Sequence, residues 1–251
     1  MSERPRVGLL VTCLVDLVRP QVAFAAVKLL EDSGCDVEVP LQTCCGQPAW
    51  NSGADRHATD LARQVIEAFE SFDYVVAPSG SCAGMIKRHY VEALANDPAY
   101  LLRARALAAK TFELVSFLVR VRGFKPVLVQ CVARACYHDS CSSLRELGVR
   151  KEPRKLLAEV EGLMLSELAE PEVCCGFGGL FSVKYPEISE RMADQKVTDA
   201  RASGANLMVG ADLGCLLHLK GRMQRTGGNI RVRHVAEVLA GMADEPALGE
   251  A

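Results

Sequence analysis

Short apolar runs alternate along the chain with longer stretches of helical period. Runs that are continuously apolar are typical of strands buried on both faces of a parallel sheet. Apolar residues that recur every three or four positions predict amphipathic helices between them. The expected strands cover residues 6–12, 74–77, 126–130, 206–209 and 230–233, and the expected helices cover 21–32, 54–71, 100–121 and 186–203. This order predicts an α/β fold with parallel-sheet, Rossmann-like layers.

The chain also contains an internal repeat. A Cys-Cys-Gly motif at residues 44–46 returns at residues 174–176, and a loop and an expected long helix follow each copy. The flanking cysteines repeat as well, Cys13 as Cys141 and Cys82 as Cys215. We therefore expect two pseudo-symmetric cysteine-rich repeats, at 1–123 and 124–241, with a flexible tail at 242–251.

Composition and charge narrow the function classes. The 251 residues carry 29 Lys and Arg against 31 Asp and Glu, a net charge of −2, so no positive field favours binding to nucleic acid. No uncharged apolar stretch reaches the roughly 18 residues of a transmembrane helix. The apolar run at 7–15 resembles a signal peptide only weakly, because Asp16 and Arg19 follow it at once. We expect a cytoplasmic protein whose 11 cysteines are reduced.

The repeated cysteines are the candidate functional residues. Each half has a cysteine after its first strand, an adjacent pair in a glycine-containing loop, and one after a later strand, and the carboxyl ends of parallel strands share one edge of the sheet. Four thiols per half would converge at that edge. Such thiolates suit iron–sulfur clusters, zinc or Cu(I), although adjacent cysteines are awkward ligands for one tetrahedral ion. The two sets are Cys13, Cys44, Cys45 and Cys82, and Cys141, Cys174, Cys175 and Cys215.

Three cysteines fall outside the repeat. We expect Cys35 and Cys131 to be packing residues, as single free cysteines often are, and Cys136 to be either a packing residue or an auxiliary thiol. His138 and Asp139 precede Cys141. They either supply a proton or hydrogen bond to the site or form an ordinary polar pair at a strand end.

The doubled Cys…Cys-Cys-Gly…Cys pattern resembles the cysteine-rich CCG domain found in heterodisulfide reductase and in the iron–sulfur component of glycolate oxidase. Segments such as CCGQPAWNSG, VVAPSGSCAGM and CCGFGGLFSVKYPEIS are more specifically similar to the lactate-utilization protein A family, with matching blocks from residue 7 to 240. The resemblance implies 4Fe-4S clusters, one or two per chain, held by the eight repeated cysteines. It further implies an iron–sulfur partner subunit and a third subunit, which together oxidise L-lactate to pyruvate.

One departure from the wider pattern leaves the identity of the cofactor undecided by the sequence. The fullest form of the motif closes each half with Cys-x-x-Cys, but Ser79 and Asp212 stand at the first position of that pair. A conventional 4Fe-4S cluster, a cluster with an oxygen ligand and a metal-free thiol site all stay open. No general base and no flavin or nicotinamide fingerprint is identified, so catalytic residues are unassigned and hydride abstraction would depend on a partner. The alternatives are a thiol–disulfide reductase and a zinc-stabilised assembly protein.

Overall fold

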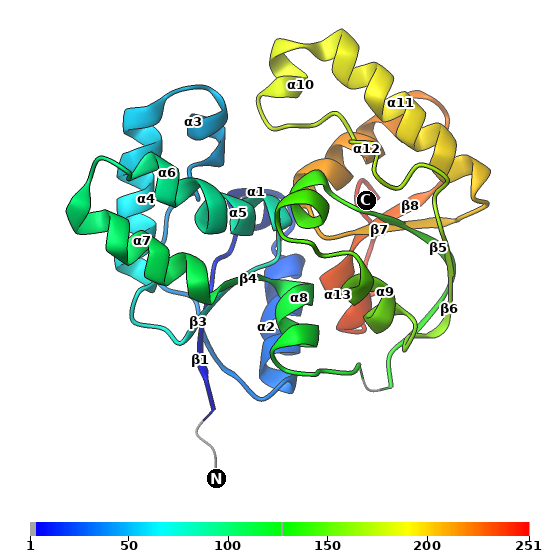
Figure 1. Ribbon diagram of the computed structural model, residues 1–251. Helices are drawn as coiled ribbons and strands as arrows, with labels where there is room; N and C mark the ends of the chain where they lie inside the picture. The colour runs from blue at the N-terminus through cyan, green and yellow to red at the C-terminus, as the bar shows by residue number, and fades with distance from the viewer. Residues whose placement is uncertain (1–3, 127, 251) are drawn as a thin grey trace. The chain divides into compact units, whose positions relative to one another are not determined.

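The computed structural model describes residues 4–126 and 128–250 of the chain (Figure 1). These residues fall into two compact units, Met1–Gly123 and Phe124–Ala251. Each unit contains a four-stranded sheet in which every strand pairing is parallel. The two sheets have equivalent strand orders, which confirms the α/β class and the two similar halves expected from the sequence.

The strand order of each sheet places a topological switch point at its centre. The first sheet contains β1 (Arg6–Leu9), β2 (Asp36–Glu38), β3 (Tyr74–Ala77) and β4 (Thr111–Glu113), in the order β2-β1-β3-β4. The second contains β5 (Gln130–His138), β6 (Glu161–Ser166), β7 (Leu207–Gly210) and β8 (Arg231–His234), in the order β6-β5-β7-β8. The winding direction reverses between β1 and β3 and between β5 and β7. Ligands of open α/β sheets bind outside the carboxyl ends of the strands at such a point.

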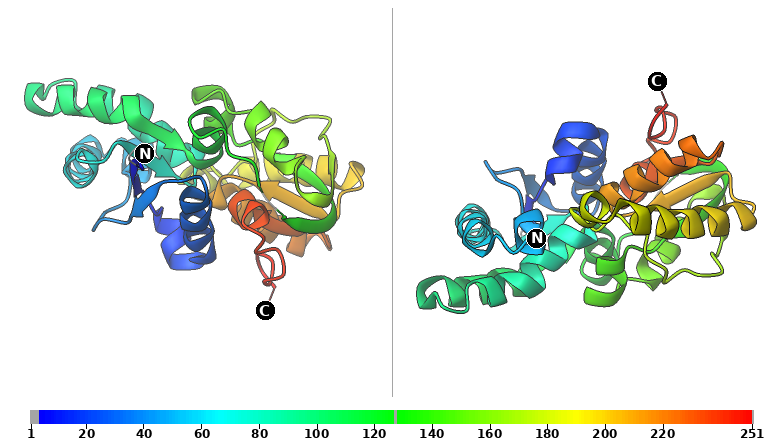
Figure 2. Two further views of the ribbon diagram at one scale, coloured as in Figure 1. Left: turned by 90° about the horizontal axis from the view of Figure 1, so that it is seen from below. Right: turned by 90° about the horizontal axis from the view of Figure 1, so that it is seen from above.

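Helices cover both sides of the first sheet. Figures 1 and 2 show α2 with α8 on one side, and α4, α6 and α7 grouped on the other. Helix α2 buries Val22, Ala25, Leu29 and Leu30, an apolar stripe of helical spacing, and ends where Gly34 adopts a φ of 82°. The helical segments are α1 (Cys13–Val18), α2 (Gln21–Asp32), α3 (Gln47–Asn51), α4 (Asp55–Phe69), α5 (Gly80–Gly84), the π-helical η1 (Met85–His89), α6 (Tyr90–Ala93), α7 (Pro98–Lys110) and α8 (Leu114–Arg120).

The second unit repeats this plan with different helix lengths. Helices α11 and α12 lie side by side, as do α9 and α13 (Figure 1). The helical segments are the π-helical η2 (Ser142–Glu146), α9 (Lys151–Leu157), α10 (Phe181–Lys184), α11 (Pro186–Ala202), α12 (Leu213–Arg225) and α13 (Val235–Leu239). The central strand β7 is buried along its whole length, as its continuous apolar run predicts.

Two expected elements are wrong. The expected helix at 100–121 is divided into α7 and α8 by strand β4, because residues 111–113 pair with β3 and complete the sheet. The strand expected at 126–130 is instead β5, which begins only at Gln130. Val127 lies outside the described residues, and Leu128 is 96% exposed with a φ of 55°, which is incompatible with a buried strand.

The sequence pattern also missed β2 and β6, which are the equivalent edge strands of the two sheets. Strand β2 has three residues, none of them buried, and no residue of the six-residue β6 is buried. At the other end of the second unit, Ala247 and Leu248 of the expected tail are buried, and the N–H of Leu248 donates to the carbonyl of Val232. These contacts tie that part of the tail to β8.

Candidate metal centres

The four repeated cysteines of the first unit gather at the carboxyl end of its sheet. Cys13 is the first residue of α1, after β1, and Cys82 lies in α5, after β3. Cys44 and Cys45 lie in the loop that connects β2 to α3. The Sγ atoms of Cys13 and Cys44 are 3.9 Å apart, and those of Cys45 and Cys82 are 3.3 Å apart. Three distant segments thus bring four thiols to the switch point of the sheet.

The second unit brings its four cysteines together in the same way. Cys141 follows β5, and Cys215 lies in the first turn of α12, after β7. The thiol of Cys141 interacts with that of Cys174, and the sulfurs of Cys175 and Cys215 lie within 4.8 Å of each other. All the cysteines are free thiols. The structure therefore places the eight predicted site residues in two equivalent clusters, and their role as ligands stays a prediction.

The glycine after each cysteine pair has a backbone that other residues rarely adopt. Gly46 has a φ of 85° and Gly176 a φ of 84°. A Cβ added to Gly176 would lie 2.6 Å from the backbone oxygen of Ser189, whereas a Cβ on Gly46 would lie 3.4 Å from Leu61. Left-handed backbone turns each loop, and in the second unit close approach of α11 also requires glycine. Gly176 N–H donates to the Sγ of Cys174 at 3.4 Å.

Buried polar groups hold the second cysteine loop in place. The ammonium of Lys196, a residue with 0% exposure, donates to the carbonyls of Glu170 and Pro171, shortly before the cysteine pair. The Asp199 carboxylate accepts from the N–H groups of Ala169 and Glu170, each at 2.9 Å. Burial lowers the pKa of Lys196. Sequence reasoning missed this support, because a lysine at a helical position is usually an exposed residue.

A tyrosine supports the corresponding loop in the first unit. The hydroxyl of Tyr90, which is fully buried, donates to the carbonyl of Cys45 at 2.9 Å. Burial raises the pKa of this hydroxyl, so it keeps its proton and stays a donor. The two units thus fix equivalent loops with unrelated side chains, which an internal sequence comparison cannot detect.

Within each cluster one thiol has a lowered pKa. Interaction with the thiols of Cys13 and Cys45 holds the pKa of Cys44 well below its usual range, whereas interaction with Cys44 raises the pKa of Cys13. The pKa of Cys174 is lowered in the same way in the second unit, with the Cys141 thiol as the largest cause. Each cluster therefore has one preferred thiolate, the form in which cysteine binds metals.

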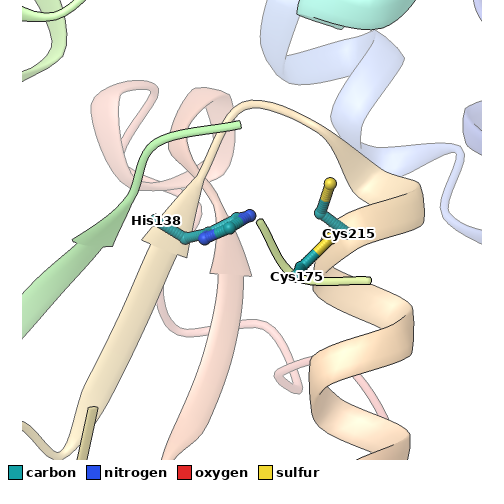
Figure 3. Close-up of side chains that lie close together, drawn as sticks. All are labelled: His138, Cys175 and Cys215. Atoms are coloured by element: carbon teal, nitrogen blue, oxygen red, sulfur yellow. The ribbon is translucent and has the colours of Figure 1, made fainter. Parts of the chain in front are cut away.

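His138 joins the second cluster. Its imidazole extends from the end of β5 toward Cys175 and Cys215 (Figure 3), and the ligand atoms of these three residues lie within 4.8 Å of one another. The side chain is buried, and among the described residues neither ring nitrogen has a hydrogen-bond partner. Burial lowers its pKa to about 4, so the ring is neutral at pH 7. Its neighbour Asp139 instead binds Arg154 through two hydrogen bonds.

The cysteines outside the repeat lie apart from these contacts. Cys35 is buried after α2, with its Sγ 3.5 Å from the hydroxyl of Ser33. Cys131 and Cys136 are both in β5, and burial raises the pKa of Cys136 to about 11. Ser79, one of the two departures from the fullest motif, accepts a hydrogen bond from the N–H of Cys82, and Asp212, the other, accepts one from Ser140.

Comparisons with known proteins agree with this geometry. The family described as "Cysteine-rich domain" matches residues 7–87 and 135–220, one match in each unit. Lactate utilization protein A of Halalkalibacterium halodurans is 49% identical over 235 residues, which cover 93% of this chain and 96% of that protein. The chain belongs to the lactate utilization protein A family. Another relative, lactate utilization protein A 2 of Bacillus cereus, is 47% identical and covers 94% of this chain and 98% of its own length.

A solved structure supports the fold of this lactate utilization protein A family member. A hypothetical protein from Helicobacter pylori matches with a TM-score of 0.70 at 10% identity, over 97% of this chain and 50% of that one. Within the described residues, no helix combines the length and apolar character needed to cross a bilayer. The cysteine-rich domain and its clustered cysteines suggest metal binding, and in the second unit the ligand atoms of His138, Cys175 and Cys215 lie close enough together to hold a metal ion.

Proposed function

We propose that the chain is an iron–sulfur component of L-lactate utilization. It would carry electrons through cysteine-ligated clusters while L-lactate is oxidised to pyruvate. The observation that carries this proposal is the gathering of four thiols at the same place in both units, in a relative of proteins named for lactate utilization. Neither the thiols nor the family name would be sufficient alone.

The donor set favours an iron–sulfur cluster over a single ion. Four thiolates are the usual ligands of 2Fe-2S and 4Fe-4S clusters. The two cysteines of each adjacent pair contact different partners, since Cys44 contacts Cys13 whereas Cys45 contacts Cys82. This divergence suits neighbouring metal atoms better than one tetrahedral ion. We propose a 4Fe-4S cluster in each unit, held by Cys13, Cys44, Cys45 and Cys82 in the first and Cys141, Cys174, Cys175 and Cys215 in the second.

The protein's own residues would position and shield the bound group. Such a cluster supplies one-electron transfer. Cys45 and Cys175 are 4% and 1% exposed, so their side of each site excludes water. Gly46 and Gly176 turn the loops, and the Gly176 N–H donates to a cysteine sulfur, a contact that stabilises negative charge on a cluster.

The chain would act as one part of a larger system. The relatives' names designate a protein A, which favours a system of several components. We propose an iron–sulfur partner subunit and a third subunit, in the cytoplasm, with hydride abstraction from lactate assigned to a partner. We assign hydride abstraction to a partner because the described side chains at the two sites are mostly thiols.

Growth on lactate tests this function. Deleting the gene from its source organism should abolish growth on L-lactate as sole carbon source and leave growth on pyruvate unchanged. The wild-type gene should restore growth, and a Cys45→Ser variant expressed at the same level should not. Normal growth of the deletion strain on L-lactate, in the absence of a second copy, would overturn the proposal.

A further inference from the structure

We propose that His138 is a metal ligand, so that the second site is a mixed sulfur–nitrogen centre while the first is an all-sulfur centre. This inference rests on the proposed function, because it assumes that the thiol clusters bind metal. It adds a fifth donor, next to Cys175 and Cys215, that the repeated cysteine pattern does not contain and that would take the place of one of the four thiolates at an iron.

The first argument is the cost of leaving this imidazole unpaired. His138 is 1% exposed, and in the part of the chain that the structure describes, both ring nitrogens lack a hydrogen-bond partner. A buried polar group without a partner has lost its hydrogen bonds to water and gained none in return, so native proteins rarely retain one without a reason. Binding a metal through one nitrogen would remove much of that cost.

The second argument is the direction in which the imidazole of His138 points. Figure 3 shows the ring pointing from the end of β5 toward Cys175 in its loop and Cys215 in the first turn of α12. The ligand atoms of the three residues lie within 4.8 Å of one another, a spread that one metal ion or adjacent irons of a cluster can bridge. The three donors come from different segments, so their convergence is a product of the fold.

The third argument is the difference between the two units. In the strand registers, Tyr137 pairs with Val209 as Leu9 pairs with Val76, so Leu10 occupies the position of His138 in the first unit. Leu10 is buried and apolar. The first unit therefore has no donor at this position, and the two sites differ in chemistry although their cysteines are equivalent.

This difference predicts how electrons would distribute between the sites. Replacing a thiolate ligand with neutral histidine makes a cluster less negative and raises its reduction potential. If His138 binds the second centre, that centre would have the higher potential, and electrons would reside there in preference to the first. Two identical clusters would have no such difference in reduction potential, and electrons would prefer neither site.

Mössbauer spectroscopy on ⁵⁷Fe-enriched, anaerobically purified full chain tests the inference, because it detects every iron in any spin state. A Cys44→Ser/Cys45→Ser variant removes the first site and serves as the parent. Its spectrum should contain one iron with the larger isomer shift of nitrogen ligation. His138→Gln should remove that component, and His138→Cys should replace it with a sulfur-type component. His218→Gln should leave it unchanged, because His218 is paired with Ser189.

The outcomes separate this inference from the proposed function. Iron with sulfur-type components alone in the parent, or a spectrum unaltered by His138→Gln, would overturn the role of His138 and leave the iron–sulfur function standing. A parent that contains zinc would overturn the iron–sulfur function. X-ray absorption at the zinc edge would then decide the role of His138 by the presence or absence of a nitrogen neighbour lost in His138→Gln. A chain without any metal would overturn both.

Discussion

The sulfur of Cys45 lies 3.3 Å from the sulfur of Cys82, although 37 positions separate the two residues in the sequence. Cys45 belongs to the loop after β2, and Cys82 to the helix after β3. Strand β1 lies between these two strands in the sheet, so the contact depends on the pairing of all three strands. The geometry of the site is therefore a consequence of the sheet order.

Replacing one thiol should empty one site. Cys45→Ser removes a buried sulfur from the first cluster without touching the second, so the iron content of the chain should fall by about half. Cys175→Ser should have the same effect through the second unit. Iron and acid-labile sulfide assays on anaerobically purified protein measure this.

Cys35→Ser is the matched control for that experiment. Cys35 is buried in the first unit, like Cys45, but its sulfur contacts Ser33 rather than the cluster. The iron content of the Cys35→Ser variant should equal that of the wild type. Equal loss of iron in Cys35→Ser and Cys45→Ser would show that the proposed ligand set is wrong.

The two equivalent glycines should differ in their tolerance of a methyl group. Gly46→Ala introduces strain from a positive φ, at about 1–2 kcal/mol. Gly176→Ala has the same strain and also places its Cβ 2.6 Å from the backbone oxygen of Ser189, so it should destabilise the protein more. Thermal unfolding of both variants measures the order. A Gly46→Ala variant less stable than Gly176→Ala would contradict the close packing of α11 on this loop.

Arg154 should contribute more to the stability of the second unit than its neighbour Arg150. It binds Asp139, whose side chain is 1% exposed, and also Glu167. Arg154→Ala leaves a buried carboxylate unpaired and should cost about 3 kcal/mol of unfolding free energy. Arg150→Ala is the control, since Arg150 and its partner Glu172 are both largely exposed, and it should cost less than about 1 kcal/mol. Urea denaturation at pH 7 compares them.

The contribution of Arg154 should also depend on pH. Its hydrogen bonds hold the pKa of Glu167 below the usual value of 4.5. A carboxyl group with a lowered pKa stabilises the fold above its unfolded pKa, and the stabilisation is lost as pH falls through the folded pKa. The difference between wild type and Arg154→Ala should therefore shrink when the pH is lowered below about 4.5. A difference that grows in acid would rule out this pairing as its source.

The sequence predicts the inner parts of the fold better than its outer parts. The observed β3 and α2 have the expected bounds, 74–77 and 21–32, because one is buried on both faces and the other carries a complete apolar stripe. Strand β4 is hidden inside a run of helical period, since the helices on both sides of it are apolar. It is a strand because Thr111 and Glu113 pair with β3, a tertiary contact that local pattern cannot reveal.

The sequence likewise predicts some parts of the candidate site and not others. Repetition of the cysteines is a local signal, and it identified eight residues that the structure gathers into two clusters. The positions of Lys196 and Tyr90 behind the loops depend on packing between distant segments. The sequence singles out His138 only for its place before Cys141, whereas the fold shows that its ring faces Cys175 and Cys215 (Figure 3).

The metal content of protein never exposed to oxygen tests the central claim most directly. The account predicts a coloured protein with broad visible absorption, containing iron and acid-labile sulfide in similar amounts. A colourless protein with stoichiometric zinc, or one with free thiols and no metal, would contradict it. The first contrary result would favour a zinc-stabilised assembly protein, and the second a thiol–disulfide reductase.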